Sequence, residues 1–411
     1  MGSVGSGLGA GHSRPDSPDV GKPADGGLRA AAARWPLVFL LWLTPSLGQL
    51  LKFAGRPGCV LVVGFAAIGI AVVLAWAMAP PAQRRGSEPP WHWLIAVVLC
   101  AVFALVYPVA VSGLFGGGSD RADALDVTGA ALLAGRLIYE PMTYLGNPPT
   151  PMPGAVILAL PFHLFGGAAL QNVFWFPLFC ALAPRIVGDR RGAAAYLAVF
   201  VLGCPGVLLD FATGSDFATN AIYVIVAAWL MTRLKPDETW PVRLLACLFF
   251  AIALSSRPIY LVEAPIVAGV MLRRGGWRPM IETMACVAVL LAVINGPIWA
   301  ADPSRFPLLL HANLLNIYPA WAHAGLLVPA VSIAIACSAL FVDLERGRMW
   351  LLSAISLAPV VAPTFLYVVW RRGLTGRLVV LDSYTLPLAL FAGLWLMRRP
   401  ARPRAPEPAS S

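Results

Sequence analysis

Long apolar runs follow one another along almost the whole of this 411-residue chain, separated by short patches of arginine, proline and glycine. A membrane-spanning helix needs about 20 mainly apolar residues. The runs therefore predict an all-α polytopic membrane protein with about twelve transmembrane helices. The predicted spans are 36–52, 57–79, 93–115, 153–182, 193–210, 214–232, 243–256, 258–272, 280–300, 322–342, 349–369 and 380–397.

Composition excludes a soluble domain. Hydrophobic residues make up 59% of the chain and charged residues 12%, whereas a water-facing surface needs far more polar groups. Three of the predicted spans are irregular. The 153–182 run is interrupted by prolines and glycines, which predicts a broken helix or two short ones. The runs on either side of Ser255–Pro258 are short, so we expect tilted or partly re-entrant segments.

The two ends of the chain differ from the rest. Residues 1–34 are rich in Gly, Ser, Pro and Ala and contain no apolar block, so we predict a disordered tail without a signal peptide. The same holds for residues 399–411. The membrane domain then covers 35–398 and includes a large loop at 116–152. The seven cysteines lack a CxxC pair and are expected to be buried apolar residues.

Positive charge predicts the orientation, because Lys and Arg collect on the cytoplasmic side of spans. The arginine clusters place both termini in the cytoplasm of a bacterial inner membrane, and 116–152, 210–216, 301–321 and 370–379 outside. A second crossing within 153–182 would reverse every later loop. The net charge of +10 suits anionic lipid headgroups in the bilayer. No nucleic-acid partner is expected, since the cations are spread over loops.

Three acids follow the third predicted span: Asp120, Asp123 and Asp126. Carboxylates at a membrane boundary are costly, which favours a functional role on a short extracytoplasmic surface helix. Asp120 has an alternative as a helix N-cap, and Asp123 and Asp126 as a solvated face. The solvated-face alternative is weakest for Asp123, because this residue has no obvious role as a helix cap and no obvious ion-pair partner. A divalent cation held by these oxygen ligands is a further alternative.

Cations on the same predicted face suggest a site for phosphate. Arg257 lies between two short apolar runs, and Arg371, Arg372 and Arg377 break the positive-inside trend. Guanidinium groups match the geometry of phosphate oxygens. The alternatives are snorkelling for Arg257 and an inverted topology for the other three. For Asp210 and Asp216 we favour a simple acidic turn over a place in an acceptor cavity.

The 301–321 loop and its flank carry aromatic and amide side chains. These are most often interface anchors, but flat faces and amides also bind sugars. The candidates for binding sugar or acceptor are His311, Asn313, Asn316, Tyr318 and Trp321. A zinc site is not favoured, because His311 and His323 have no nearby carboxylate in a helical motif.

The order of these motifs resembles the GT-C superfamily of integral-membrane glycosyltransferases, which use polyprenyl-phosphate sugars, and is mannosyltransferase-like. An acidic motif opens the first large outer loop, Gly135 and Tyr139 form Gly-x-x-x-Tyr, and a proline-rich turn precedes an apolar run reaching Phe165-Gly166. The resemblance covers 93–300 well. It extends loosely to the last three spans, where Ser383-Tyr384 and Pro387 are similar to the family's terminal helix.

The resemblance implies a hexosyl or pentosyl transferase of the cell envelope. A sugar would leave a polyprenyl phosphate and join a hydroxyl of a lipid, polysaccharide or protein acceptor outside the membrane. An aspartate would act as general base and arginine would stabilise the departing phosphate. The family's base corresponds to Asp120 or Asp123, then Asp126, and Tyr384 joins the candidates for acceptor binding. The chain departs from the family's commoner Asp-Glu pairing, which leaves the choice of base open.

A transporter or lipid flippase is the alternative class. Carriers often contain internal repeats and mid-span charges, and the two halves of this chain show no convincing repeat. Glu263 and Asp382 are the main acids within predicted spans. Charge at one outer-face cavity would favour the enzyme, and charge at mid-bilayer would favour the carrier.

Overall fold

The computed structural model describes residues 24–79, 90–112, 120–307, 324–342, 344, 346–373 and 379–398. These residues form α-helices joined by loops and by short 3-10 or π segments, and they include no strand. The elements are α1 (Ala24–Leu43), α2 (Leu47–Phe53), α3 (Gly55–Met78), α4 (Trp91–Val111), α5 (Arg121–Leu133), α6 (Pro153–Leu164), η1 (Ala168–Leu170), α7 (Gln171–Val187), α8 (Arg190–Tyr196), η2 (Leu197–Leu202), α9 (Pro205–Ala212), α10 (Phe217–Met231), α11 (Trp240–Leu254), η3 (Pro258–Val262), α12 (Glu263–Gly275), α13 (Trp277–Ala301), η4 (Pro303–Arg305), α15 (Ala324–Cys337), η7 (Ser338–Leu340), α16 (Arg346–Arg372) and α17 (Val379–Leu396).

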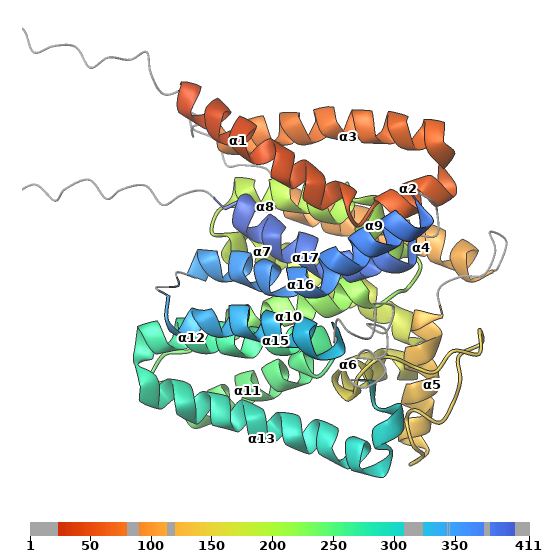
Figure 1. Cartoon of the computed structure of the whole chain (residues 1–411), viewed down its shortest axis with the longest axis vertical. Coiled ribbons are helices and arrows are strands. Elements are labelled where there is room, and N and C mark those ends of the chain that lie inside the picture. The colour runs from red at the N-terminus through yellow and green to blue at the C-terminus, as the bar shows by residue number, and fades with distance from the viewer. Residues whose placement is uncertain are drawn as a thin grey trace, which may run out of the picture.

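The long helices share one direction, and α5 lies across them at one end of the bundle (Figure 1). We call this end, with the connections 213–216 and 255–257, the α5 end. The buried side of α5 packs on α6, where Leu125 belongs to one apolar cluster with Ala155 and Val156. Leu132, seven residues further along α5, is exposed. The helix predicted to lie across the chain's spans is therefore present, held by protein contacts on one side.

Exposed apolar surface marks this as a membrane-embedded helical protein. Helices α3, α4 and α13 are long and apolar, yet little of each is buried inside the protein. On α3, Phe65 is 75% exposed, and Leu61, Ile68 and Val72 are exposed beside it. An apolar face of this length is stable in lipid and not in water. The bilayer is therefore the partner of these surfaces.

Fewer helices qualify as spans than the sequence suggested. By length and composition, five helices among the described residues can cross a membrane, or up to seven if each of two bent pairs is one span. The prediction was about twelve. All twelve predicted ranges do coincide with helices or broken helices, but several of these are short. Five apolar helices have only 10–17 residues: 153–164, 217–231, 240–254, 327–340 and 383–396.

The 153–182 run is broken, as its glycines predicted. Helix α6 ends before Gly166 and Gly167, whose φ angles of 130° and 138° suit residues without a Cβ. Before α6, Gly154 donates from its N–H to the carbonyl of Ser255 at 2.9 Å. A Cβ at position 154 would overlap the carbonyl oxygen of Ile252. This close approach holds the start of α6, and the loop before it, against the end of α11.

The N-terminal helix begins earlier than expected. Residues 24–34 were predicted to be disordered, but α1 starts at Ala24. The alanines at 30–33 explain the difference, because alanine has the highest helix propensity. Arg34 then donates from Nη1 to the carbonyls of Leu396 and Arg398, at 2.6 and 3.0 Å. The first half of α1 and the end of α17 therefore lie together.

Candidate functional site

The acids of α5 fasten this helix to the loop that precedes α6. Asp120 occupies the N-cap position, but its side chain makes no capping hydrogen bond. Its Oδ2 instead accepts from Thr143 Oγ1 and Asn147 Nδ2, both at 2.8 Å. Asp123 Oδ2 accepts from the backbone N–H of Tyr144 at 2.7 Å. The N-cap position predicted as the alternative for Asp120 is thus confirmed, but its side chain does not cap the helix, and Asp123 has a partner that the sequence did not reveal.

Each of these two carboxylates is held by one oxygen. The contacts of Asp120 and Asp123 all use Oδ2, so Oδ1 of each is without a partner among the residues that the structure describes. Neither residue is buried. The pKa of the Tyr144 hydroxyl is raised, first by burial and then by the negative charges of Asp120 and Asp123. Both carboxylates therefore retain an acceptor oxygen in a part-exposed position.

Asp126 belongs to a separate contact. Its Oδ1 lies 2.7 Å from His163 Nδ1 on α6 and accepts from the N–H of Ala168 in η1 at 2.8 Å. The solvated-face interpretation is therefore wrong for Asp126, which joins three elements. Because one oxygen makes both contacts and the imidazole is fixed, Asp126 serves the packing of α5 more directly than do the other two acids.

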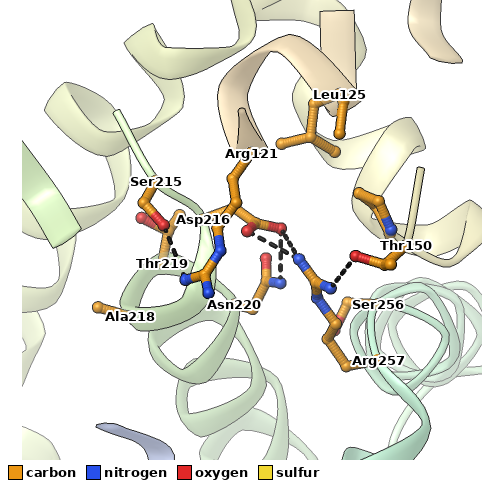
Figure 2. A network of polar contacts seen from close by, with 12 residues as sticks. Arg121, Leu125, Thr150, Ser215, Asp216, Ala218, Thr219, Asn220, Ser256 and Arg257 are labelled. Carbon is orange, nitrogen blue, oxygen red and sulfur yellow. Dashed lines mark hydrogen bonds and ion pairs between the residues drawn. The ribbon is translucent and has the colours of Figure 1, made fainter. Parts of the chain in front are cut away.

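A buried ion pair lies beside α5. Arg257 is 2% exposed and Asp216 fully buried, and Nη2 of the arginine lies 2.8 and 2.7 Å from the two carboxylate oxygens. Nη1 donates to Thr150 Oγ1 at 3.0 Å. In Figure 2 the guanidinium lies between Asp216 and Thr150. Asn220 Nδ2 adds a hydrogen bond of 3.0 Å to Asp216. This pair joins the 255–257 connection, the start of α10 and the loop before α6.

A second arginine meets the same aromatic ring. The Cζ atoms of Arg121 and Arg257 lie 4.0 and 4.4 Å from the ring centre of Phe217, within the range of cation–π attraction. Arg121 also lies 3.6 Å from the buried Asp210. We call Arg121, Asp210, Asp216, Phe217 and Arg257 the Phe217 cluster. The formal charges of its two arginines and two aspartates sum to zero.

Arg121 differs from Arg257 in exposure. Its side chain is 22% exposed, and Nη1 donates to Ser215 Oγ at 3.3 Å (Figure 2). Its distance to Asp210 exceeds that of a good hydrogen bond. Arg121, the first residue of α5, therefore extends its guanidinium from this helix into the Phe217 cluster.

Two buried donors near the Phe217 cluster lack partners. Arg257 Nε and the Tyr260 hydroxyl make no hydrogen bond to any residue that the structure describes. Buried polar groups are nearly always paired, so each orphan calls for an acceptor. Among the described residues, the two donors are therefore unused hydrogen-bonding groups beside the cluster.

The structure brings some of the predicted site residues together. The Tyr384 ring packs edge-on against Phe217, with 5.0 Å between ring centres, so Tyr384 and Arg257 share one environment. Arg371 is elsewhere. It is exposed and contacts Tyr367 and Trp370 on its own helix. Outside the described residues or side chains lie Arg372, Arg377, His311, Asn313, Asn316, Tyr318, Trp321 and Asp382. A clamp of Arg257 with the 371–377 arginines stays a prediction.

Sequence reasoning missed Arg121, His163 and Asp216 as partners. The simple-turn interpretation of Asp210 and Asp216 is wrong, because both are buried and face arginines. The sequence did contain one indication of the Asp216–Arg257 pair. An arginine between apolar runs needs a compensating carboxylate, and Asp216 was an acid predicted at the same membrane face.

A metal centre finds no support in the described ranges. They contain no group of three His, Cys, Asp or Glu side chains able to hold an ion. Asp120, Asp123 and Asp126 bind different partners and do not converge. The divalent cation at these acids stays an untested prediction.

Comparison with known proteins identifies no family for this chain. No protein-family model, no curated protein and no solved structure matches this chain.

Proposed function

We propose that this protein is a GT-C-like membrane glycosyltransferase that moves a hexosyl or pentosyl group from a polyprenyl phosphate to an acceptor hydroxyl. One observation carries the proposal: α5, which lies across the bundle at the α5 end, bears two part-exposed carboxylates, and it also bears Arg121, whose guanidinium meets the same Phe217 ring as that of Arg257. Acids and a cation on one helix at a membrane boundary suit a reaction in which a hydroxyl loses a proton while a phosphate gains charge.

Asp120 or Asp123 is the general base. Hydrogen bonds to Oδ2 fix the carboxylate, and Oδ1 takes the proton of the acceptor hydroxyl. The acceptor oxygen then bonds to the anomeric carbon as the bond from that carbon to the phosphate oxygen breaks, and the leaving phosphate keeps the electron pair. Attack opposite the leaving group inverts the anomeric centre. Asp126 is placed last because its carboxylate contacts the His163 imidazole and so joins α5 to α6, although its Oδ2, like Oδ1 of the other two acids, has no partner among the described residues.

Arg121 and Arg257 act on the phosphate in different ways. Arg121 is part-exposed, so phosphate oxygens can approach its guanidinium directly. Arg257 is fixed by Asp216 and contributes mainly by its charge and by its unpaired Nε. Tyr384 borders the same ring from α17.

The proposal includes the topology. Counting the seven candidate spans together with α10, α11, α12, α15 and α17 gives about twelve crossings, of which the short ones require local thinning of the bilayer. The α5 end then faces outward from a bacterial inner membrane, and the arginines around 185–191 and 273–278 lie inside. A lipid, a polysaccharide or a protein supplies the acceptor.

Transfer of radiolabelled sugar from polyprenyl phosphate, by purified protein in lipid, tests the proposal. We expect Asp120→Asn or Asp123→Asn to lower the rate by about 10²–10⁴-fold, the usual contribution of a general base. Asp237→Asn is the matched control, because Asp237 is an exposed acid in the turn between α10 and α11. Full activity in both single variants and in the double variant would refute the assignment.

Transport or lipid flipping is the second candidate, and one observation favours it. Glu263 is an acid buried completely among the helices, where ion-coupled carriers place ionisable groups. Uptake of the same polyprenyl-linked sugar into sealed vesicles, without chemical transfer, separates the two functions.

A further inference from the structure

Glu263 is a buried carboxyl group that the proposed transfer does not use. It is the first residue of α12 and is fully buried. Oε2 lies 2.9 Å from Ser353 Oγ on α16. Oε1 has no hydrogen-bond partner in the described ranges. Within those ranges no Lys, Arg or His makes an ion pair with Glu263.

The charged groups around α12 whose side chains the structure describes are engaged elsewhere or exposed. This holds for α12 itself and for the elements packed on it, which are α10, α13, α15, α16, η3 and η7. Arg273 donates to Leu340 O, Arg274 to Thr232 O, Arg278 pairs with Glu282, Arg371 contacts Tyr367, and Arg348 is exposed. The side chains of Arg346 and Arg372 on α16 lie outside the described ones, and the remaining titratable groups of these elements include Tyr223 and Tyr260. An ionised Glu263 would therefore be a buried charge without a cation among the described side chains, which is strongly disfavoured.

The single hydrogen of the Ser353 hydroxyl also favours a protonated Glu263. Ser353 Oγ lies 3.0 Å from the carbonyl of Met349 as well as 2.9 Å from Glu263 Oε2. A hydroxyl has one hydrogen, and a carbonyl can only accept. If Ser353 donates to Met349, its contact with Glu263 requires a hydrogen on the carboxyl group. Both contacts are hydrogen bonds only when Glu263 is protonated.

We propose that Glu263 is a proton-binding site, a neutral carboxylic acid at neutral pH. It donates from Oε2 to Ser353 Oγ, which donates in turn to Met349 O. This chain joins α12 to α16 directly after η3, the segment that follows Arg257 along the chain. The bound proton thus supports the element next to the Phe217 cluster, and the inference rests on neither proposed function.

Infrared spectroscopy of the full-length protein in lipid at neutral pH provides the test. The wild type should show the carbonyl band of a hydrogen-bonded carboxylic acid that is lost in Glu263→Gln. Glu282→Gln is the matched control, because this glutamate is half exposed and paired with Arg278, so the band should remain. Ser353→Ala should shift the band to higher frequency, since the acceptor is removed.

Thermal stability gives an independent readout. Glu263→Gln should unfold at the wild-type temperature, because its amide also donates to Ser353, whereas Glu263→Ala should unfold at a lower temperature. The proposal fails if Glu263→Gln leaves the carboxylic-acid band unchanged. It also fails if this variant loses as much stability as Glu263→Ala, the behaviour of a site that needs a carboxylate. If Glu263→Gln does not fold, the response of the band to Ser353→Ala decides.

Discussion

The Phe217 cluster and the acids of α5 lie at the same end of the molecule and differ mainly in burial. Asp216 is inaccessible and both of its oxygens face Arg257, whereas Asp120 and Asp123 are part-exposed and each is held by one oxygen. The same side-chain chemistry therefore has two consequences. The buried carboxylate is fixed by compensation of charge, and each part-exposed one keeps an oxygen without a partner among the described residues.

The difference has an energetic basis. Removing one partner of a buried ion pair leaves a charge in a medium that cannot solvate it. Removing an exposed charge leaves little behind, because water already screened it. Substitutions in the Phe217 cluster should thus lower the stability most, whereas substitutions of Asp120 and Asp123 should mainly lower the proposed activity.

The largest effect on stability is expected for Asp216→Asn. The substitution leaves Arg257 buried without a counter-charge, at a cost of about 3–5 kcal/mol. Thermal unfolding in detergent or lipid should show a large fall in midpoint. Replacing Arg257 as well, in Asp216→Asn with Arg257→Met, should recover much of the loss. No loss in the single variant would mean that the pair is not compensated as described.

Asp126→Asn should have an intermediate effect. It weakens charge-assisted contacts to His163 and to the N–H of Ala168, which are worth about 1.5–3 kcal/mol when a charged group takes part. A double-mutant cycle with His163→Ala measures the coupling between the two side chains. Additive effects would contradict a direct contact between α5 and α6 through this pair.

The smallest change in stability is expected for Asp120→Asn. The amide oxygen can still accept from Thr143 and Asn147, so the midpoint should move by the equivalent of less than about 1 kcal/mol. If Asp120 is the base, sugar transfer should nevertheless fall by about 10²–10⁴-fold. An unfolding midpoint that falls as far as that of Asp216→Asn would make Asp120 a structural residue and remove the contrast between the regions.

Several features of the fold could be read from the sequence because they depend on local properties. Apolar runs coincide with helices, and Gly166 and Gly167 break the 153–182 run at the residues that allow a positive φ. The crossing helix α5 follows from acids after an apolar run. The number of qualifying spans was overestimated, because hydropathy alone does not show that many helices are short or bent.

The site was predictable only in part. Arg257 was identified because a cation within apolar sequence needs an explanation. Its partners Asp216 and Thr150 come from other connections and became evident only from the packing of α6, α10 and α11. Arg121 was overlooked because its neighbours in sequence are acids, which gave no sign that its side chain reaches Phe217.

The sequence by itself determined that this chain is helical, that lipid surrounds it, and that charge collects near residues 120–126 and 257. These follow from hydropathy and from the cost of placing charge in an apolar medium. Only the tertiary structure decided which of those charges are neutralised. Ion pairing acts over a few ångströms, and the pairs Asp216–Arg257 and Asp126–His163 join residues far apart in the chain. The acids first noticed after the third apolar run are thereby divided into Asp126, which joins α5 to α6 and η1, and Asp120 and Asp123, which join α5 to the 143–147 loop.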